Sequence, residues 1–154
     1  MPNKLTNLLG LSREQMEAFL LELGEKPFRA IQLLKWIHQF GITDFDAMTN
    51  ISKSLREQLK DCAEVRPPLV KERYDASDGC YKWIVVVESG SSIETVYIPE
   101  TSRGTLCISS QVGCVLTCSF CHTGTQKFVR NLTSGEILQQ ICIAKDDLND
   151  WHPD

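Results

Sequence analysis

Three cysteines in one short segment are the residues whose types and spacing could do chemistry. Cys114, Cys118 and Cys121 form a CxxxCxxC pattern. Three thiolates on one tight loop can ligate three irons of an iron–sulfur cube, which leaves the fourth iron open to bind a small molecule. Structural zinc normally takes four protein ligands in paired motifs, and His122 is too close to Cys121 to reach the same ion easily. The spacing therefore favours an iron–sulfur cluster over zinc and over three unrelated buried cysteines.

The other four of the seven cysteines are interpreted from their sequence context. An odd number of cysteines without a secretory signal argues against a disulfide framework. Cys62 and Cys142 lie in apolar helical patterns, which predicts small core residues, and Cys80 lies in a predicted turn. Cys107 lies in a predicted strand, where alternation would bury it about as often as direct it at a cavity, and spacing alone favours a core position.

The composition is that of an ordinary globular chain. It has 154 residues, of which 42% are hydrophobic and 23% are charged, with a formal net charge of −4. That acidic balance argues against strong nucleic-acid binding by electrostatics alone. No apolar run approaches the roughly 20 residues that span a bilayer, and no secretory signal is evident. We therefore expect a cytoplasmic protein without a membrane segment.

Residues 1–66 predict a small helical accessory domain. Ser12 and Gln15 have the spacing of a capping box, apolar residues follow at helical intervals, and Gly24 supplies a stop. Further helical segments are expected over 27–41, 44–48 and 52–62. Five basic residues of this domain could contact RNA phosphates, although a solvated face of mixed charge is the favoured interpretation: Arg29, Lys35, Lys53, Arg56 and Lys60.

Pro67 and Pro68 mark the predicted end of the helical domain, because two prolines in succession favour an extended chain. Residues 67–104 predict an antiparallel β connector, and residues 105–154 predict a strand, the cysteine-rich loop and a helix. Strands are expected over 69–74, 81–88, 92–98 and 105–109, and the helix over 134–147, capped by Thr133 or Ser134. The fold class is α+β, ending in the first βα unit of an incomplete α/β barrel.

Several motifs resemble one family of radical S-adenosylmethionine enzymes. The aromatic residue just before the third cysteine, Phe120, is typical of that superfamily. The segments 94–100, 105–114, 120–124 and 130–132 resemble the adenine-C2 RNA methyltransferases, which act on 23S ribosomal RNA and on transfer RNA. The resemblance extends into the helical domain through residues 26–32 and 36–37.

This resemblance implies roles for individual residues. Cys114, Cys118 and Cys121 would ligate a [4Fe–4S] cluster, with Phe120 in the same cofactor site and S-adenosylmethionine on the open iron. In the family, a cysteine near the carboxyl end carries the methyl group, and a second cysteine forms a disulfide that releases the product. Cys107 stands at that second position, so the resemblance favours a catalytic role over a core position. Glu94 stands at the position of a proton acceptor, and its alternative is an ordinary strand carboxylate.

The resemblance also implies partners and leaves alternatives. We expect 23S ribosomal RNA and transfer RNA as substrates, an electron donor such as flavodoxin, and a monomer. Family members are much longer than this chain and carry a methyl-bearing cysteine that it lacks, so the chain alone is expected to be inactive. The alternatives are a methyltransferase acting on C8 of the same ribosomal adenine, a non-catalytic zinc- or RNA-binding module, and a remnant that misfolds through exposed strand edges.

Overall fold

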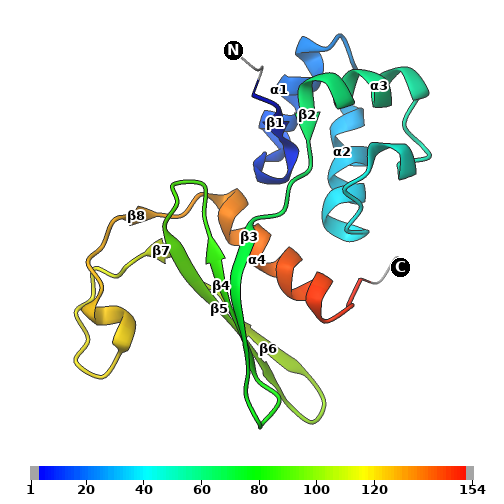
Figure 1. The fold of residues 1–154 in the computed structure, drawn as a ribbon. Helices are drawn as coiled ribbons and strands as arrows, with labels where there is room; N and C mark the ends of the chain where they lie inside the picture. The colour runs from blue at the N-terminus through cyan, green and yellow to red at the C-terminus, as the bar shows by residue number, and fades with distance from the viewer. Residues whose placement is uncertain (1–3, 152–154) are drawn as a thin grey trace. The chain divides into compact units, whose positions relative to one another are not determined.

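A computed structural model describes residues 4–151 and divides the chain into two compact units. The helical unit comprises the residues up to Pro67 together with the segment from Lys145, and the sheet unit comprises Pro68–Ala144. Figure 1 shows helices in the first and an antiparallel sheet in the second. The observed mixture of helix and sheet confirms the predicted α+β class. The three-part domain division of the sequence stays a prediction.

The helical unit forms around three helices, α1 (Arg13–Glu22), α2 (Phe28–Leu34) and α3 (Lys53–Cys62). The predicted capping box is confirmed: Gln15 N–H donates to Ser12 Oγ at 3.2 Å, and Ser12 N–H donates to Gln15 Oε1 at 2.8 Å. The helices bury one apolar face each, and the core contains Met16, Leu20, Leu33, Leu55 and Leu59. Short elements complete the unit: β1 (Thr6–Asn7), η1 (Leu8–Gly10), η3 (Phe45–Ala47) and β2 (Ala63–Glu64), with β1 parallel to β2.

The predicted helix over 27–41 changes pitch within its length. After α2, residues Lys35–Gln39 form a π-helical segment, η2, which hydrophobic periodicity does not reveal. Gly41 ends the segment with φ of +67°, as predicted for a stop. The Trp151 ring lies against this glycine, where a Cβ atom would be 2.3 Å from the ring. Trp36, Phe40, Ile42 and Trp151 line an apolar cavity of about 420 Å³.

The sheet unit contains a four-stranded antiparallel meander in chain order. Its strands are β3 (Leu69–Asp75), β4 (Tyr81–Val86), β5 (Ser92–Pro99) and β6 (Gly104–Cys107). All four predicted strands are confirmed to within a few residues. The strand expected to open a βα unit, β6, also pairs antiparallel with β5 and so extends the meander. The last two strands are short, β7 (Gln111–Val112) and β8 (Arg130–Asn131), and they pair with each other.

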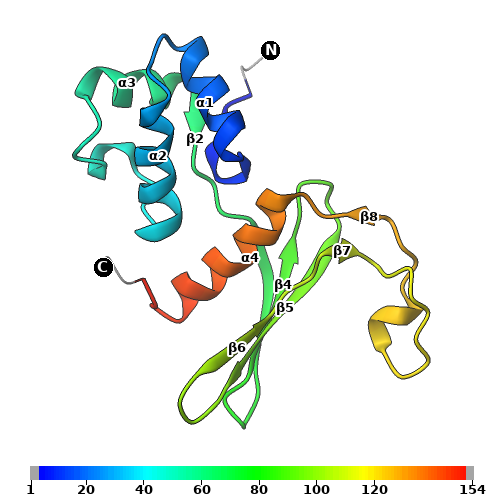
Figure 2. The ribbon, with the colours of Figure 1, turned by 180° about the vertical axis from the view of Figure 1, so that it is seen from behind.

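Helix α4 (Ser134–Asp147) follows β8 and has the predicted bounds. Up to Ala144 it lies across one face of the sheet, as the front and back views both show (Figure 1, Figure 2). The strand residues on this covered face are buried: Trp83, Val85, Ile93 and Thr95. The alternate residues lie on the opposite face, which α4 does not cover, and they include Lys82, Ile84, Glu94, Val96 and Cys107. None of the helices within residues 4–151 combines the length and apolar character needed to cross a bilayer.

Candidate functional site

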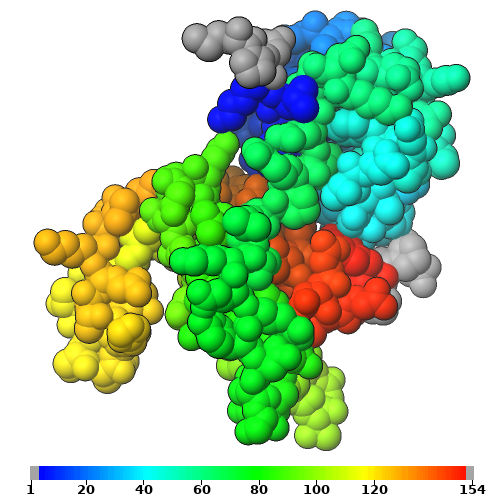
Figure 3. Space-filling model, in the orientation of Figure 1, coloured from blue at the N-terminus to red at the C-terminus, as the bar shows by residue number. Residues whose placement is uncertain are grey.

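The cysteine loop, residues 113–129, is closed at its base by main-chain contacts. Val129 N–H donates to Val112 O at 2.8 Å, and Cys114 forms a bridge with Lys127. Gly113 has φ of +74°, and a Cβ atom there would be 2.0 Å from Lys127 O. Only glycine combines that conformation with such a close approach of two chain segments. The loop protrudes from the sheet of its own unit in the space-filling view, where it is yellow (Figure 3).

Inside the loop the backbone turns tightly around the three cysteines. Cys121 N–H donates to Cys118 O at 3.2 Å, and Gly124 N–H donates to Cys121 O at 3.0 Å, which leads into the short helix η4 (His122–Thr125). A Cβ atom on Gly124 would be 2.8 Å from Cys118 O, so the loop has no room for a larger residue there. Leu116 N–H donates to Cys114 Sγ at 3.3 Å. Hydrogen bonds of this kind to ligand sulfur atoms tune iron–sulfur clusters.

All three loop cysteines are free thiols. Cys121 is exposed, Cys114 and Cys118 are half-buried, and the Phe120 ring is 91% exposed. Within residues 4–151, no group of three or more histidine, cysteine or acidic side chains is gathered in a metal-binding arrangement. The residues fit a [4Fe–4S] cluster in the chemistry of their donors, three thiols on one closed loop with a main-chain N–H directed at one sulfur. They provide no fourth thiol, which fits a cluster with one open iron better than tetrahedral zinc.

Glu94 and Cys107 lie on the same face of the sheet. Val96 on β5 is directly opposite Cys107 on β6, and Glu94 precedes Val96 by two residues, so all three side chains share one side. Both Glu94 and Cys107 are exposed on the face that α4 does not cover. The core position that spacing alone favours for Cys107 is therefore wrong, and the catalytic role that the resemblance implies stays a prediction. Lys82 Nζ lies 3.4 Å from Glu94 Oε1.

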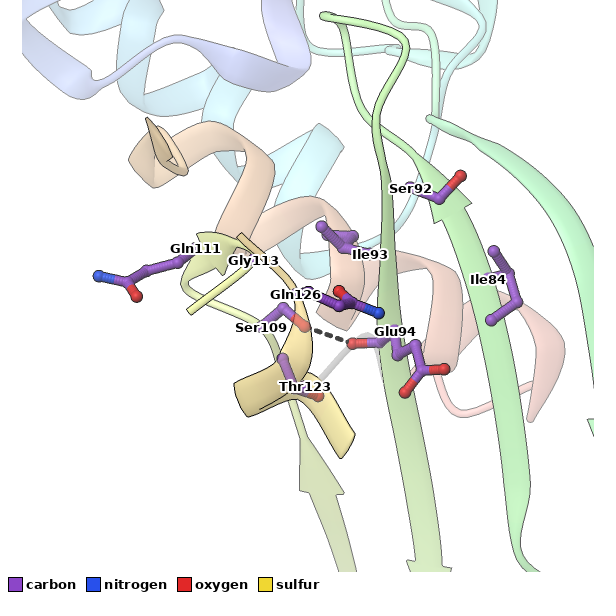
Figure 4. A pocket seen from close by; sticks show the side chains of 9 residues that line it. All are labelled: Ile84, Ser92, Ile93, Glu94, Ser109, Gln111, Gly113, Thr123 and Gln126. Atoms are coloured by element: carbon purple, nitrogen blue, oxygen red, sulfur yellow. Dashed lines mark hydrogen bonds between the residues drawn. The ribbon is translucent and has the colours of Figure 1, made fainter. Parts of the chain in front are cut away.

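A cavity of about 230 Å³ lies between this sheet face and the cysteine loop. Its lining consists of Ile84, Ser92, Ile93, Glu94, Ser109, Gln111, Gly113, Thr123 and Gln126. Figure 4 shows Glu94 from β5 beside Thr123 and Gln126 from the loop, whereas Gln111 points away, where it donates to Asn131 Oδ1. Ser109 Oγ donates to Glu94 O at 2.6 Å and fixes the strand at this point. One predicted site residue, Glu94, thus lines the same cavity as Thr123 and Gln126 of the loop that carries the cysteines.

A partly buried ion pair holds the carboxyl side of the loop on α4. Arg130 Nη1 and Nη2 donate to the two carboxylate oxygens of Glu136 at 2.8 and 2.7 Å. Glu136 also accepts from Thr133 N–H at 2.9 Å, while Glu136 N–H donates to Thr133 Oγ1 at 3.2 Å. Thr133 is thus the cap, one of the two residues predicted. The bonds from Arg130 and Thr133 lower the pKa of Glu136 to about 2.

The two cysteines predicted from helical patterns to be core residues, Cys62 and Cys142, differ in burial. Cys142 is buried, as predicted, whereas Cys62 is half-buried; burial raises the pKa of the Cys62 thiol. Cys80 is also half-buried, and its hydrogen bond with Asp78 raises the pKa of the Cys80 thiol. No disulfide is present within residues 4–151.

Two of the five basic residues singled out in the helical unit, Arg29 and Lys60, have acidic neighbours. Lys60 Nζ lies 2.8 Å from Asp46 Oδ1 and 3.0 Å from Glu57 Oε1. Arg29 Nε lies 3.8 Å from Glu25. These pairs favour the interpretation of a solvated face of mixed charge over a strip of phosphate contacts.

Known proteins resemble this chain in sequence and in fold. Residues 6–65 match the family model described as ribosomal RNA large subunit methyltransferase N-terminal domain. Over 90% of its length the chain is 60% identical to the dual-specificity RNA methyltransferase RlmN of Pseudomonas fluorescens, and over 94% it is 55% identical to that of Saccharophagus degradans. The chain belongs to the RlmN family.

A solved structure supports the same relationship. A crystal structure of a radical SAM methyltransferase from Sphaerobacter thermophilus covers 94% of the chain with a TM-score of 0.79 and 34% sequence identity. The chain accounts for 43% of that structure, and it spans about a third of the length of the RlmN relatives, 36% in each case. The RlmN similarity therefore covers both units of the chain but only part of each relative.

Proposed function

We propose that the chain is the part of a radical S-adenosylmethionine RNA methyltransferase that carries the cluster loop and the proton acceptor. The observation that carries the proposal is the closed loop with Cys114, Cys118 and Cys121 beside a pocket that contains Glu94. The names of the RlmN relatives support RNA as the substrate. The specific reaction is methylation of C2 of an adenine in 23S ribosomal RNA and in transfer RNA.

The three loop cysteines would hold a [4Fe–4S] cluster, with Phe120 in the same cofactor site. When bound, this cluster supplies one electron and an open iron for S-adenosylmethionine, which provides the radical route that an unreactive aromatic carbon requires. The chain's own part is to hold three thiols on a closed loop. The Leu116 N–H directed at Cys114 Sγ stabilises negative charge on that sulfur.

Glu94 would take the proton from adenine C2. Its carboxylate lines the pocket, and the Lys82 ammonium lies 3.4 Å from it. Cys107 would assist product release with its thiol, which is exposed on the same sheet face. The methyl-bearing cysteine and most of the barrel would come from the longer protein. We further propose a cytoplasmic, monomeric enzyme that receives electrons from a flavodoxin-type donor.

Metal analysis tests the first part of this proposal. Anaerobic reconstitution of the protein with iron and sulfide is expected to give close to one [4Fe–4S] cluster per chain, and Cys118→Ala is expected to lose it. Cys62→Ala is the matched control, because Cys62 lies on α3 outside the loop. Stoichiometric zinc without sulfide would support a metal-binding module and contradict the radical mechanism.

Product analysis tests the second part. The full-length protein, incubated with S-adenosylmethionine, an electron donor and RNA, is expected to yield 2-methyladenosine, identified by chromatography and mass spectrometry of the digested RNA. Glu94→Gln is expected to lower the yield at unchanged cluster content. A product methylated at C8 would instead assign the chain to the other reaction on the same base.

A further inference from the structure

Gln140 is a fully buried polar side chain in the middle of α4, with 0% of its surface exposed. Neighbouring buried positions on this helix hold Cys142, Ile143 and Ala144, which need no hydrogen-bond partners in the core. A buried amide destabilises a fold unless its donors and acceptors are all satisfied. The contacts of Gln140 therefore show what the side chain is for.

The amide of Gln140 uses its full bonding capacity, and half of it on one residue. Gln140 Oε1 accepts from Ser109 N–H and from Thr95 Oγ1, each at 2.8 Å. Gln140 Nε2 donates to Ser109 O at 2.8 Å and to Glu136 O at 3.4 Å. The orientation of the amide is fixed, because a main-chain N–H can only donate and a main-chain carbonyl can only accept. Gln140 thus binds both main-chain groups of Ser109, as a neighbouring strand would.

Ser109 lies where the chain has left the sheet. Strand β6 ends at Cys107 and β7 begins at Gln111, so Ser109 belongs to neither strand. Its hydroxyl donates to Glu94 O at 2.6 Å, and Thr95, the next residue of β5, donates to Gln140. Gln140 is therefore bonded, directly or through Ser109, to the segment between Cys107 and the cysteine loop and to β5 beside Glu94.

We propose that Gln140 is a positioning residue for the methyl transfer. It fixes Ser109, and with it the spacing between Glu94, Cys107 and the cysteine loop, while it contacts none of the reacting groups. The inference rests on the proposed function, because it assigns Gln140 to that reaction. A displacement of about 1 Å of a reacting group can lower a rate by about 100-fold.

The experiment uses the full-length protein with its cluster and compares three variants with the wild type. Gln140→Met keeps the approximate shape and removes every bond of the amide. Gln140→Glu keeps the acceptor for Ser109 N–H and loses the donor to Ser109 O. Thr95→Val is the matched control, because it removes the one bond from β5 to Gln140 that does not involve Ser109 and keeps the side-chain shape.

We expect a graded loss of kcat at unchanged iron and sulfide content and unchanged KM for RNA. The loss is about 10- to 100-fold for Gln140→Met, smaller for Gln140→Glu, and less than about twofold for Thr95→Val. Hydrogen exchange at the amide of Ser109 should accelerate in Gln140→Met and stay slow in Thr95→Val, because only the first loses its acceptor.

Two results would overturn the inference. One is a Gln140→Met enzyme that melts at a lower temperature but keeps the wild-type kcat per cluster, which would assign Gln140 to stability alone. If that variant does not fold, a wild-type kcat in Gln140→Glu leads to the same conclusion. The other is hydrogen exchange at the Ser109 amide that stays as slow in Gln140→Met as in the wild type, although this variant has lost the acceptor for that amide. Exchange reports on Gln140 even if the wild type transfers no methyl group, in which case the proposed function fails separately.

Discussion

Helices α3 and α4 show two ways of holding a fold together. Helix α3, in the helical unit, buries Leu55 and Leu59 and directs its other charged residues to solvent, while Arg56 is half-buried. Helix α4, in the sheet unit, buries Glu136 and Gln140, while Leu138 and Ile141 remain 44% and 37% exposed. The first helix contributes mainly apolar area. The second contributes directed hydrogen bonds and an ion pair, which fix the position of particular residues.

This difference indicates which amino-acid substitutions each unit tolerates. Apolar contacts are non-directional, so a repacked helical core keeps its fold if its volume is preserved. The polar contacts of α4 depend on individual atoms, so isosteric substitutions there remove specific bonds. The sheet unit, which carries Glu94, Cys107 and the cysteine loop, is therefore the unit in which individual polar side chains fix the main chain.

The largest effect is expected from a cavity in the helical unit. Leu55 is fully buried, so Leu55→Ala should lower the free energy of unfolding by about 2–5 kcal/mol. Urea unfolding monitored by tryptophan fluorescence measures this loss, and iron uptake by the cysteine loop should persist in the folded fraction. Leu21→Ala is the control on an exposed leucine. Equal losses in both variants would contradict the described core.

Breaking the ion pair of α4 should have the next largest effect, and it should depend on pH. The pKa of Glu136 is about 2 in the folded chain and near 4.5 when unfolded, so its ionised form stabilises the fold above pH 4.5. That contribution, up to about 3 kcal/mol, is lost as the pH falls from about 4.5 towards 2. Glu136→Gln should therefore be less stable than the wild type at pH 7 and nearly equal to it at the acid end. A difference that does not depend on pH would contradict the pairing.

The base of the cysteine loop offers a smaller and more local test. Gly113→Ala places a methyl group 2.0 Å from Lys127 O at a positive φ, whereas Gly90→Ala meets a positive φ with no atom within 4 Å. The free energy of unfolding of the Gly90→Ala control should fall by about 1–2 kcal/mol from the backbone conformation alone, and that of Gly113→Ala should fall further. Only Gly113→Ala should also lower iron uptake on reconstitution. Similar iron content in the two variants would show that closure of the loop is not required.

The helical unit follows from its sequence because its signals are local. Ser12 and Gln15 predict the start of α1, and the apolar spacing predicts the buried faces. The π-helical segment over Lys35–Gln39 could not be predicted in this way, because one extra residue per turn leaves hardly any trace in hydrophobic periodicity. Local rules therefore give the elements but not their irregularities.

The sheet unit is only partly predictable for a related reason. The bounds of α4 follow from capping and composition, but its buried side does not, because hydrophobic periodicity favours burial of Leu138 and Ile141 rather than Gln140. The role of Gln140 depends on Ser109, which is 31 residues away in the chain. Two adjacent glutamines inside an apolar helical pattern are the one signal that could have indicated it. For the three loop cysteines, the spacing alone indicates a shared role, and that role stays a prediction.

The pairing of β7 with β8, which closes the base of the cysteine loop, has a consequence for how a cofactor would bind. Joining the ends of a loop of this length costs roughly 2 kcal/mol of free energy, because the chain loses conformational entropy. The pairing of β7 with β8 joins these ends when the chain folds. Assembly of a cluster then begins from a ring already formed, with its thiols at high effective concentration. A loop whose ends are already joined has less conformational freedom left to lose on binding, which is the general advantage of preorganisation.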